Sequence, residues 1–146
     1  TAKRLWSNKT AKEILADLTQ AMKTVESTGL FKAKVLMLPP AQYNQLRKPY
    51  SDYALTTLLQ WLNSEGMYFS KIITSRVCMA TNNGDTVDYM FVYDDDPEVV
   101  QLITTQQLKL GKPVYDIIDT MEMAATLKTA GIMVRHPSAL YVGKGI

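Results

Sequence analysis

The stretch from Thr10 to Pro40 constrains the fold more than any other, because it predicts a long amphipathic helix followed at once by a buried strand. Thr10 and Glu13 have the spacing of a capping box, in which a hydroxyl and a carboxylate satisfy free amides at a helix start. Apolar residues then recur at helical spacing: Ile14, Leu15, Leu18, Met22 and Val25. We therefore expect a helix over residues 10–28, ended by Gly29, whose apolar stripe needs a partner surface.

The rest of the first half predicts one buried strand and two further helices. Residues 34–38 form a short apolar run, which the two prolines after it end, since proline cannot donate to a sheet ladder. A short helix is expected over residues 41–46. A longer one should follow a cap at Ser51 or Asp52, because its leucines share one helical face: Leu55, Leu58, Leu59 and Leu62.

The second half is typical of antiparallel strands. Residues 67–80 are rich in β-branched and aromatic side chains, and we expect them to pair with residues 86–93 in a hairpin around the turn at Asn82–Asp85. Residues 99–108 are extended, and residues 114–135 alternate as long strands do, with a turn or kink at Ala130–Gly131. Residues 139–142 give a last short strand, so the fold class is α+β with roughly six strands.

Composition limits the functional classes. A chain of 146 residues with 47% hydrophobic content suits one domain, with or without a smaller lobe. No apolar run approaches the roughly 20 residues of a membrane helix, and the first residues lack the apolar core of a signal peptide. The net charge of +2 is too small to indicate nucleic-acid binding. The lone Cys78 excludes an internal disulfide and a multi-cysteine metal site.

Three patterns could carry chemistry, and each has a structural interpretation that we favour. Cys78 and His136 could form a nucleophile–base pair, but a cysteine within an apolar strand usually behaves as a small hydrophobe. The run Asp94–Asp96 with Glu98 could bind a hard cation, although its spacing is not that of a calcium loop. A turn with a solvated face, or an acidic patch for a subunit contact, fits better. Gly143–Gly145 resembles a phosphate loop only superficially, so we expect a flexible end there. We predict no catalytic, cofactor-binding or metal-binding residues.

Two segments resemble a known family. After the long helix, the apolar strand of residues 34–38 ends in prolines and the aromatic Tyr43. Residues 123–142 form a closing strand with Arg135, Pro137 and Tyr141 at its corner. This order and spacing resembles the major capsid proteins of tailed bacteriophages and prophages, whose Hong Kong 97-type fold is shared with encapsulin shells. Residues 89–100 also look like a stretch common in one phage-associated branch.

The resemblance implies a phage major-capsid-type fold with a long spine helix, antiparallel strands and an inserted axial domain. A peripheral domain would comprise residues 1–49, with the spine helix at 10–28, and the returning strands of residues 114–146. Residues 50–113 would be the axial domain, with the Asn82–Asp85 or Asp94–Asp96 turn near the centre of a pentamer or hexamer. The family normally has an N-terminal arm and an extended loop before the spine helix, which we expect this chain to lack.

The resemblance also implies a role without catalysis. We expect the core of a phage or prophage major capsid subunit that self-assembles into an icosahedral head around double-stranded DNA. Its partners would be copies of itself, packaged DNA bound non-specifically, and scaffold or portal proteins, with no membrane and no cofactor. It would be made in the bacterial host cytoplasm and reside in the virion capsid. The alternatives are an encapsulin-like compartment shell, an interaction module that binds a peptide at a sheet edge, and a Cys/His enzyme.

Overall fold

The computed structural model describes residues 5–49, 56–64, 69–115 and 121–146. The chain forms two compact units. The first, called here the sheet unit, comprises residues 1–95 and 136–146, and the second, the hairpin unit, comprises residues 96–135. The described residues contain both helices and antiparallel strands, so the predicted α+β class is confirmed. None of the helices in the described ranges is long and apolar enough to cross a bilayer.

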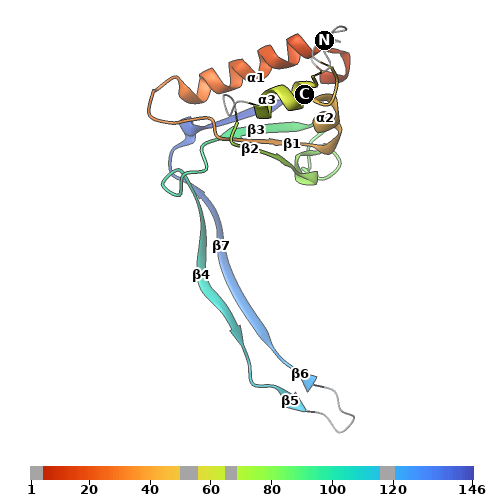
Figure 1. Cartoon of the computed structure of the whole chain (residues 1–146). Coiled ribbons are helices and arrows are strands. Elements are labelled where there is room, and N and C mark those ends of the chain that lie inside the picture. Colours follow the sequence, from red (N-terminus) through yellow and green to blue (C-terminus); the bar gives the residue numbers. More distant parts are fainter. Residues whose placement is uncertain (1–4, 50–55, 65–68, 116–120) are drawn as a thin grey trace. The chain divides into compact units, whose positions relative to one another are not determined.

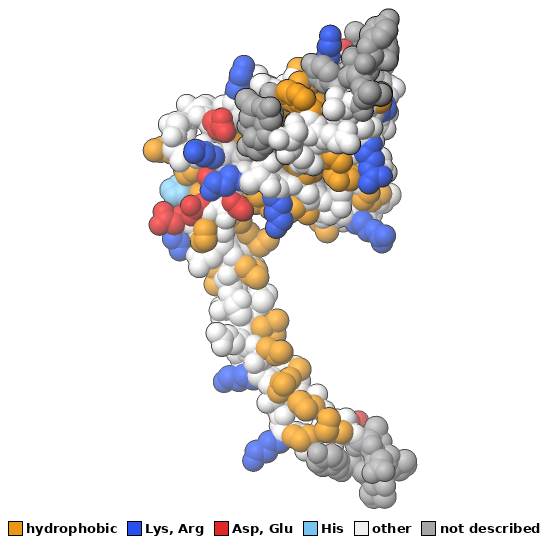
Figure 2. Space-filling view, viewed as in Figure 1, with side chains coloured by type: hydrophobic (Ala, Val, Ile, Leu, Met, Phe, Trp, Pro, Cys, Tyr) orange, Lys and Arg blue, Asp and Glu red, His pale blue; other side chains and the backbone are white. Residues whose placement is uncertain are grey.

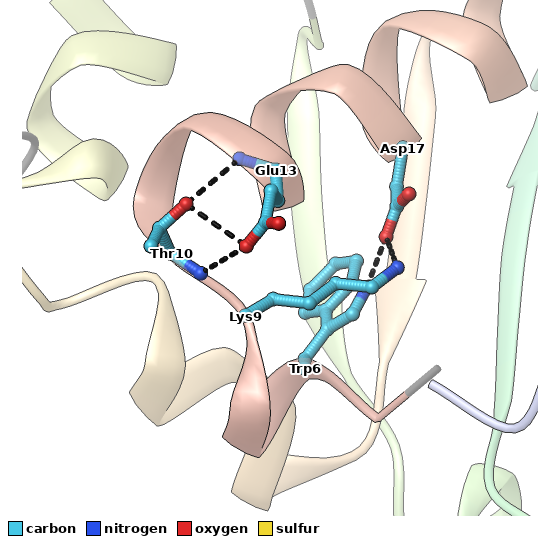
Figure 3. Close-up of polar contacts among 5 residues, drawn as sticks. All are labelled: Trp6, Lys9, Thr10, Glu13 and Asp17. Carbon is cyan, nitrogen blue, oxygen red and sulfur yellow. Dashed lines mark hydrogen bonds and ion pairs between the residues drawn. The ribbon is translucent and has the colours of Figure 1, made fainter. Parts of the chain in front are cut away.

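The long helix α1 (Ala11–Glu26) confirms the prediction for the start of the chain. Thr10 caps it through the expected reciprocal bonds with Glu13, which Figure 3 shows. Just before it, the short 3₁₀ helix η1 (Trp6–Asn8) buries Trp6 completely. The Trp6 indole Nε1 donates to Asp17 of α1 over 3.0 Å, and Lys9 forms an ion pair with the same carboxylate (Figure 3). The N-terminal segment is thereby fixed onto the helix.

The four strands of the sheet unit are β1 (Val35–Leu38), β2 (Lys71–Thr74), β3 (Tyr89–Tyr93) and β8 (Leu140–Lys144). Their order is β2-β1-β3-β8, with β1 and β2 parallel and the other neighbours antiparallel. The predicted hairpin between residues 67–80 and 86–93 is therefore wrong, because β1 lies between β2 and β3. A buried apolar strand such as β1, with neighbours on both edges, satisfies its backbone more completely than an edge strand does.

One face of this sheet carries the core. The apolar stripe of α1 packs over it, as Figure 1 shows, with Ile14, Leu18 and Val25 fully buried. Complete burial of such a side chain contributes about 1.5–3 kcal/mol. The helix α3 (Leu58–Ser64) adds Leu58 and Leu62 to the same cluster, and the short helix α2 (Pro40–Gln45) packs the partly buried Tyr43 against it. The predicted caps Ser51 and Asp52 lie outside the described residues, and Thr57 and Gln60 bond reciprocally at the described start of α3.

The hairpin unit consists of paired strands. β4 (Val100–Leu110) and β7 (Ala125–Val134) form one antiparallel ladder, and β5 (Val114–Tyr115) and β6 (Met121–Glu122) form another. The predicted kink is confirmed, because Gly131 has a φ of 97° beside a register shift in the ladder. A φ in this range is costly for any residue other than glycine.

The two units have different boundaries from the lobes that the sequence predicts. The sequence predicts a peripheral domain of residues 1–49 and 114–146 and an axial domain of residues 50–113, and this division stays a prediction. In the structure, one sheet combines strands from all three segments. The physical reason is the pairing of β1 with β2 and β3, which joins segments far apart in the sequence. Which unit corresponds to a peripheral or an axial part stays a prediction.

Candidate functional site

Cys78 and His136, the candidate nucleophile and base, lie at opposite ends of the sheet. Cys78 is in the 3₁₀ helix η2 (Arg76–Cys78) that follows β2, not in a strand as predicted, and it is 1% exposed. Burial raises the pKa of its thiol. His136 precedes β8, and its ring packs against Phe31 with 5.3 Å between centroids. Because β2 and β8 run in the same direction, the end of one and the start of the other are far apart.

The acidic run divides between the two units and makes local contacts in each. Asp94 is 5% exposed, its carboxylate lies 2.7 Å from Lys34 Nζ, and it accepts a hydrogen bond from the Lys32 amide. Asp96 accepts a hydrogen bond from the backbone amide of Glu98 across 2.9 Å, which is a turn contact. Within the described ranges, no group of three or more His, Cys, Asp or Glu side chains could hold a metal ion. Asp96 therefore lies in a turn, as predicted, whereas Asp94 is buried in an ion pair and is not part of a solvated face.

The segment Gly143–Gly145 belongs to the sheet and not to a flexible end as the sequence suggested. Gly143 and Lys144 complete β8, and a Cβ at Gly143 would lie only 2.8 Å from the Met90 Cε. Gly145 donates its amide to the Asp88 carbonyl, and Ile146 is 7% exposed. Strand pairing and packing therefore hold this segment, which corrects the flexible end that the sequence predicts.

The most unusual surface of the chain is the ladder of β4 and β7. Large apolar side chains that a sheet normally buries are exposed along it, as Figure 2 shows by their orange colour. Leu102 is 62% exposed, Leu127 57% and Ile132 72%. A solitary two-stranded ladder is marginally stable in water, and contiguous exposed apolar surface usually marks a contact site.

The register of the ladder places these side chains on a single face. Leu102 lies opposite Ile132, and Leu110 lies opposite Ala125, so each pair shares a face. Even and odd positions of β7 would normally point to opposite faces. The register shift next to Gly131 inserts one extra residue into β7, because Ile103 faces Gly131 while Thr104 faces Thr129. This bulge reverses the alternation of β7, as β-bulges do. Two further shifts, between Thr104 and Gln106 and between Gln106 and Lys109, each insert one residue into β4, so their effects on its alternation cancel. Leu110 and Ala125 therefore lie on the same side of the ladder as Leu102 and Ile132.

We call this surface the hairpin face. It comprises the apolar residues that lie on this side of the ladder: Val100, Leu102, Leu110, Ala125, Leu127, Ile132 and Val134. Leu108, which is 60% exposed, lies in the irregular stretch between Gln106 and Lys109. The opposite face carries the half-buried Ile103 and Met133 but is otherwise mainly polar. Gln101, Thr126 and Lys128 lie on it, and Arg135 donates to Gln101 across 3.0 Å. Such a two-faced ladder can bury one side against another polypeptide and keep the other side in water.

The sheet unit has a second apolar surface on the side opposite α1. Four side chains, one from each strand, align directly across it: Ile73, Met37, Phe91 and Val142. The first three are half-buried and Val142 is 39% exposed. This row is less exposed than the hairpin face, so the hairpin face is the stronger candidate for a contact surface.

The sequence matches the family described as major capsid protein over residues 1–146. The chain belongs to the major capsid protein family. Its fold is similar to the capsid protein of Myoviridae phage XM1, with a TM-score of 0.80 at 12% identity over 99% of this chain and 50% of that one. No curated protein matches it.

Two further solved structures share the capsid fold. A phage-related protein from Bordetella bronchiseptica RB50 has a TM-score of 0.68 at 12% identity, over 97% of this chain and 53% of that one. A virus-like particle from Pyrococcus furiosus has a TM-score of 0.62 at 21% identity, over 91% and 51%. The capsid chain thus spans about half the length of these structures.

Sequence reasoning identified the family but missed the hairpin face. The sequence predicts residues 99–108 as extended and residues 114–135 as alternating strands, but it does not place their apolar side chains on one face. In β7 the apolar positions change from even numbers at Ile132 and Val134 to odd numbers at Ala125 and Leu127. That change hides the alternation unless a bulge is assumed at Gly131. The glycine itself was the available signal, since an isolated glycine within a strand often marks a bulge.

Proposed function

We propose that this capsid chain is part of a structural subunit that self-assembles into an icosahedral phage or prophage head enclosing double-stranded DNA. The family match over residues 1–146 supports a shell protein. The hairpin face is the observation that carries the proposal, because a folded subunit with an uncovered apolar ladder needs another surface to cover it.

Repetition of one contact explains how such a face would build a shell. Closed assemblies arise when identical subunits repeat the same contacts under symmetry. The leucines of the hairpin face have about 60% of their surface exposed. Burial of each one against a neighbouring subunit would therefore contribute about 1–2 kcal/mol. Several such side chains are enough to hold weakly associating subunits together when each subunit repeats the contact with its neighbours.

The remaining partners follow from the shell role. Copies of the subunit would meet in pentamers and hexamers, and packaged DNA would contact the inner surface without sequence specificity. Scaffold and portal proteins would be further partners during assembly. The subunit would be made in the cytoplasm of a bacterial host and reside in the virion capsid, with a structural role and no catalytic one.

A compartment shell of the encapsulin type is the second candidate. The structural similarity to an archaeal virus-like particle favours it, since that particle shares the fold. The two candidates differ in their contents, which would be DNA in a head and protein in a compartment. Nuclease-protected DNA inside purified particles would support the first, and enclosed protein without DNA would support the second.

The assembly test uses the protein expressed from its full reading frame. Light scattering should give a mass of many subunits, and negative-stain images should show rings, sheets or closed shells. A protein that stays monomeric at every concentration, in the host and after purification, would contradict the shell proposal. A saturable one-to-one complex with a foreign peptide would then favour the interaction module.

A further inference from the structure

The loop between β2 and β3 is fixed by side-chain bonds to the backbone, and Asn83 is at its centre. The Asn83 Nδ2 donates to the Val87 carbonyl at 2.9 Å and to the Cys78 carbonyl at 3.4 Å. The Asn83 Oδ1 accepts from the Asp85 amide at 2.8 Å. The carboxamide is therefore bonded through both of its polar atoms, and it connects η2 to the segment before β3.

The residue after Asn83 is a glycine, which makes this amide chemically labile. The Gly84 backbone nitrogen can attack the Asn83 Cγ, so that a C–N bond forms and the side-chain nitrogen leaves as ammonia. Water then opens the resulting succinimide and leaves aspartate or isoaspartate at position 83. Gly84 is exposed, has a φ of 74° and carries no side chain that would hinder the ring closure.

We propose that Asn83–Gly84 is a site of spontaneous deamidation that the folded loop suppresses and that local opening of the loop exposes. In the folded loop, the carboxamide must leave Val87 and Asp85 before its carbon can turn toward the Gly84 nitrogen. Local opening of this kind is the route by which folded proteins expose protected groups. The inference does not depend on the proposed function, because the reaction needs only this turn and solvent water.

Deamidation would also remove hydrogen bonds that hold the loop in place. A carboxylate at position 83 cannot donate, so the carbonyls of Val87 and Cys78 would both lose their donor. It would also place a second negative charge beside exposed Asp85. Cys78 is 1% exposed and is the chain's single cysteine, so the reactivity of its thiol reports on this loosening.

The first test compares the rate of deamidation in the folded and the urea-denatured wild-type chain. Peptide mapping by mass spectrometry follows the amide-to-acid change at Asn83 in mildly alkaline buffer, with Asn82 as an internal control. We expect the folded chain to react at least about tenfold more slowly, because the three hydrogen bonds of the Asn83 carboxamide must open first. Equal rates in the two states, or no reaction at Asn83 in the denatured chain, would overturn the proposal.

The second test measures how fast a thiol reagent labels Cys78 in the folded protein. Asn83→Asp imitates the product, and Thr81→Asp adds the same charge at an exposed position of the same loop. We expect labelling to be about tenfold faster in Asn83→Asp than in Thr81→Asp, because only the former loses the donor to the Cys78 carbonyl. Equal rates of Cys78 labelling in both variants would contradict the proposal that deamidation loosens the loop.

Discussion

Leu18 in α1 and Leu127 in β7 are the same residue type in opposite surroundings. Leu18 is 0% exposed, on the side of α1 that packs on the sheet, and Leu127 is 57% exposed on the hairpin face. The sheet unit has two layers, so its apolar stripe finds a partner surface within the chain. The hairpin unit has one layer of paired strands and offers its own apolar residues no such surface.

This difference separates two uses of apolar side chains. In the sheet unit they supply the free energy of folding, whereas in the hairpin unit they are available for contact with another polypeptide. The bulge at Gly131 supports the second use, because without it the apolar residues of β7 would divide between the two faces of the ladder.

The largest expected effect comes from a charge in the core of the sheet unit. Leu18→Asp should destabilise the protein by about 4 kcal/mol or more, because an unpaired buried charge is very costly. Leu127→Asp places the same charge on the hairpin face and should change the free energy of unfolding of the subunit by less than about 0.5 kcal/mol. Thermal melting of both variants checks the contrast, and equal melting temperatures would show that Leu18 is not in the core.

A change at the bulge should alter the hairpin unit selectively. Gly131→Val forces a β-branched residue toward a φ of 97°, at a cost of about 1–2 kcal/mol, or moves the register to avoid it. Either result disturbs the hairpin face while the sheet unit keeps its core. Amide hydrogen exchange should increase in β4 and β7 and stay unchanged in β1 and β3. Unchanged protection throughout would mean that the glycine is not required.

A smaller effect is expected at the start of α1. Thr10→Ala removes the hydroxyl that accepts the Glu13 amide, and such a loss typically costs about 1 kcal/mol. Urea denaturation of the sheet unit measures it. Thr10→Ser, which retains the hydroxyl, is the matched control and should unfold as the wild type does.

The smallest effect concerns pH. A hydrogen bond from Tyr89 is the largest cause that lowers the pKa of the Asp85 carboxyl, followed by the Thr86 amide. A lowered folded-state pKa stabilises the protein above the ordinary aspartate value of about 3.9, and this stabilisation is lost as the pH falls through the folded value. Because Asp85 is exposed, the effect should be slight. Tyr89→Phe should flatten the dependence of the urea midpoint on pH in this acid range, and an unchanged slope would refute the coupling.

The sequence predicted those parts of the fold that depend on residues close together along the chain. The capping box, the apolar stripe of α1 and the positive φ of Gly29 all follow from short spacings, and the structure confirms each one. The pairing of β1 with β2 could not be obtained in this way. Parallel strands meet across a long connection, and the turn at Asn82–Asp85 resembled a hairpin turn although it belongs to a longer bonded loop.

The sequence predicted less of the candidate site than of the fold. Cys78 and His136 do not come together: Cys78 lies in η2, and His136 packs against Phe31. In the acidic run, Asp94 forms an ion pair with Lys34. The hairpin face depends on register, which sequence alternation alone cannot fix across a bulge. The fixed amide of Asn83 depends on carbonyls up to five residues away and is visible only in three dimensions.

The most direct measurement of the central claim is the particle mass of two matched variants, determined by light scattering on protein from the full reading frame. Leu127→Asp adds a charge to the hairpin face, and Thr126→Asp adds the same charge to the opposite face one residue away. We predict that Leu127→Asp remains folded but no longer forms large particles, while Thr126→Asp assembles as the wild type does. Normal assembly of Leu127→Asp would contradict the role of the hairpin face.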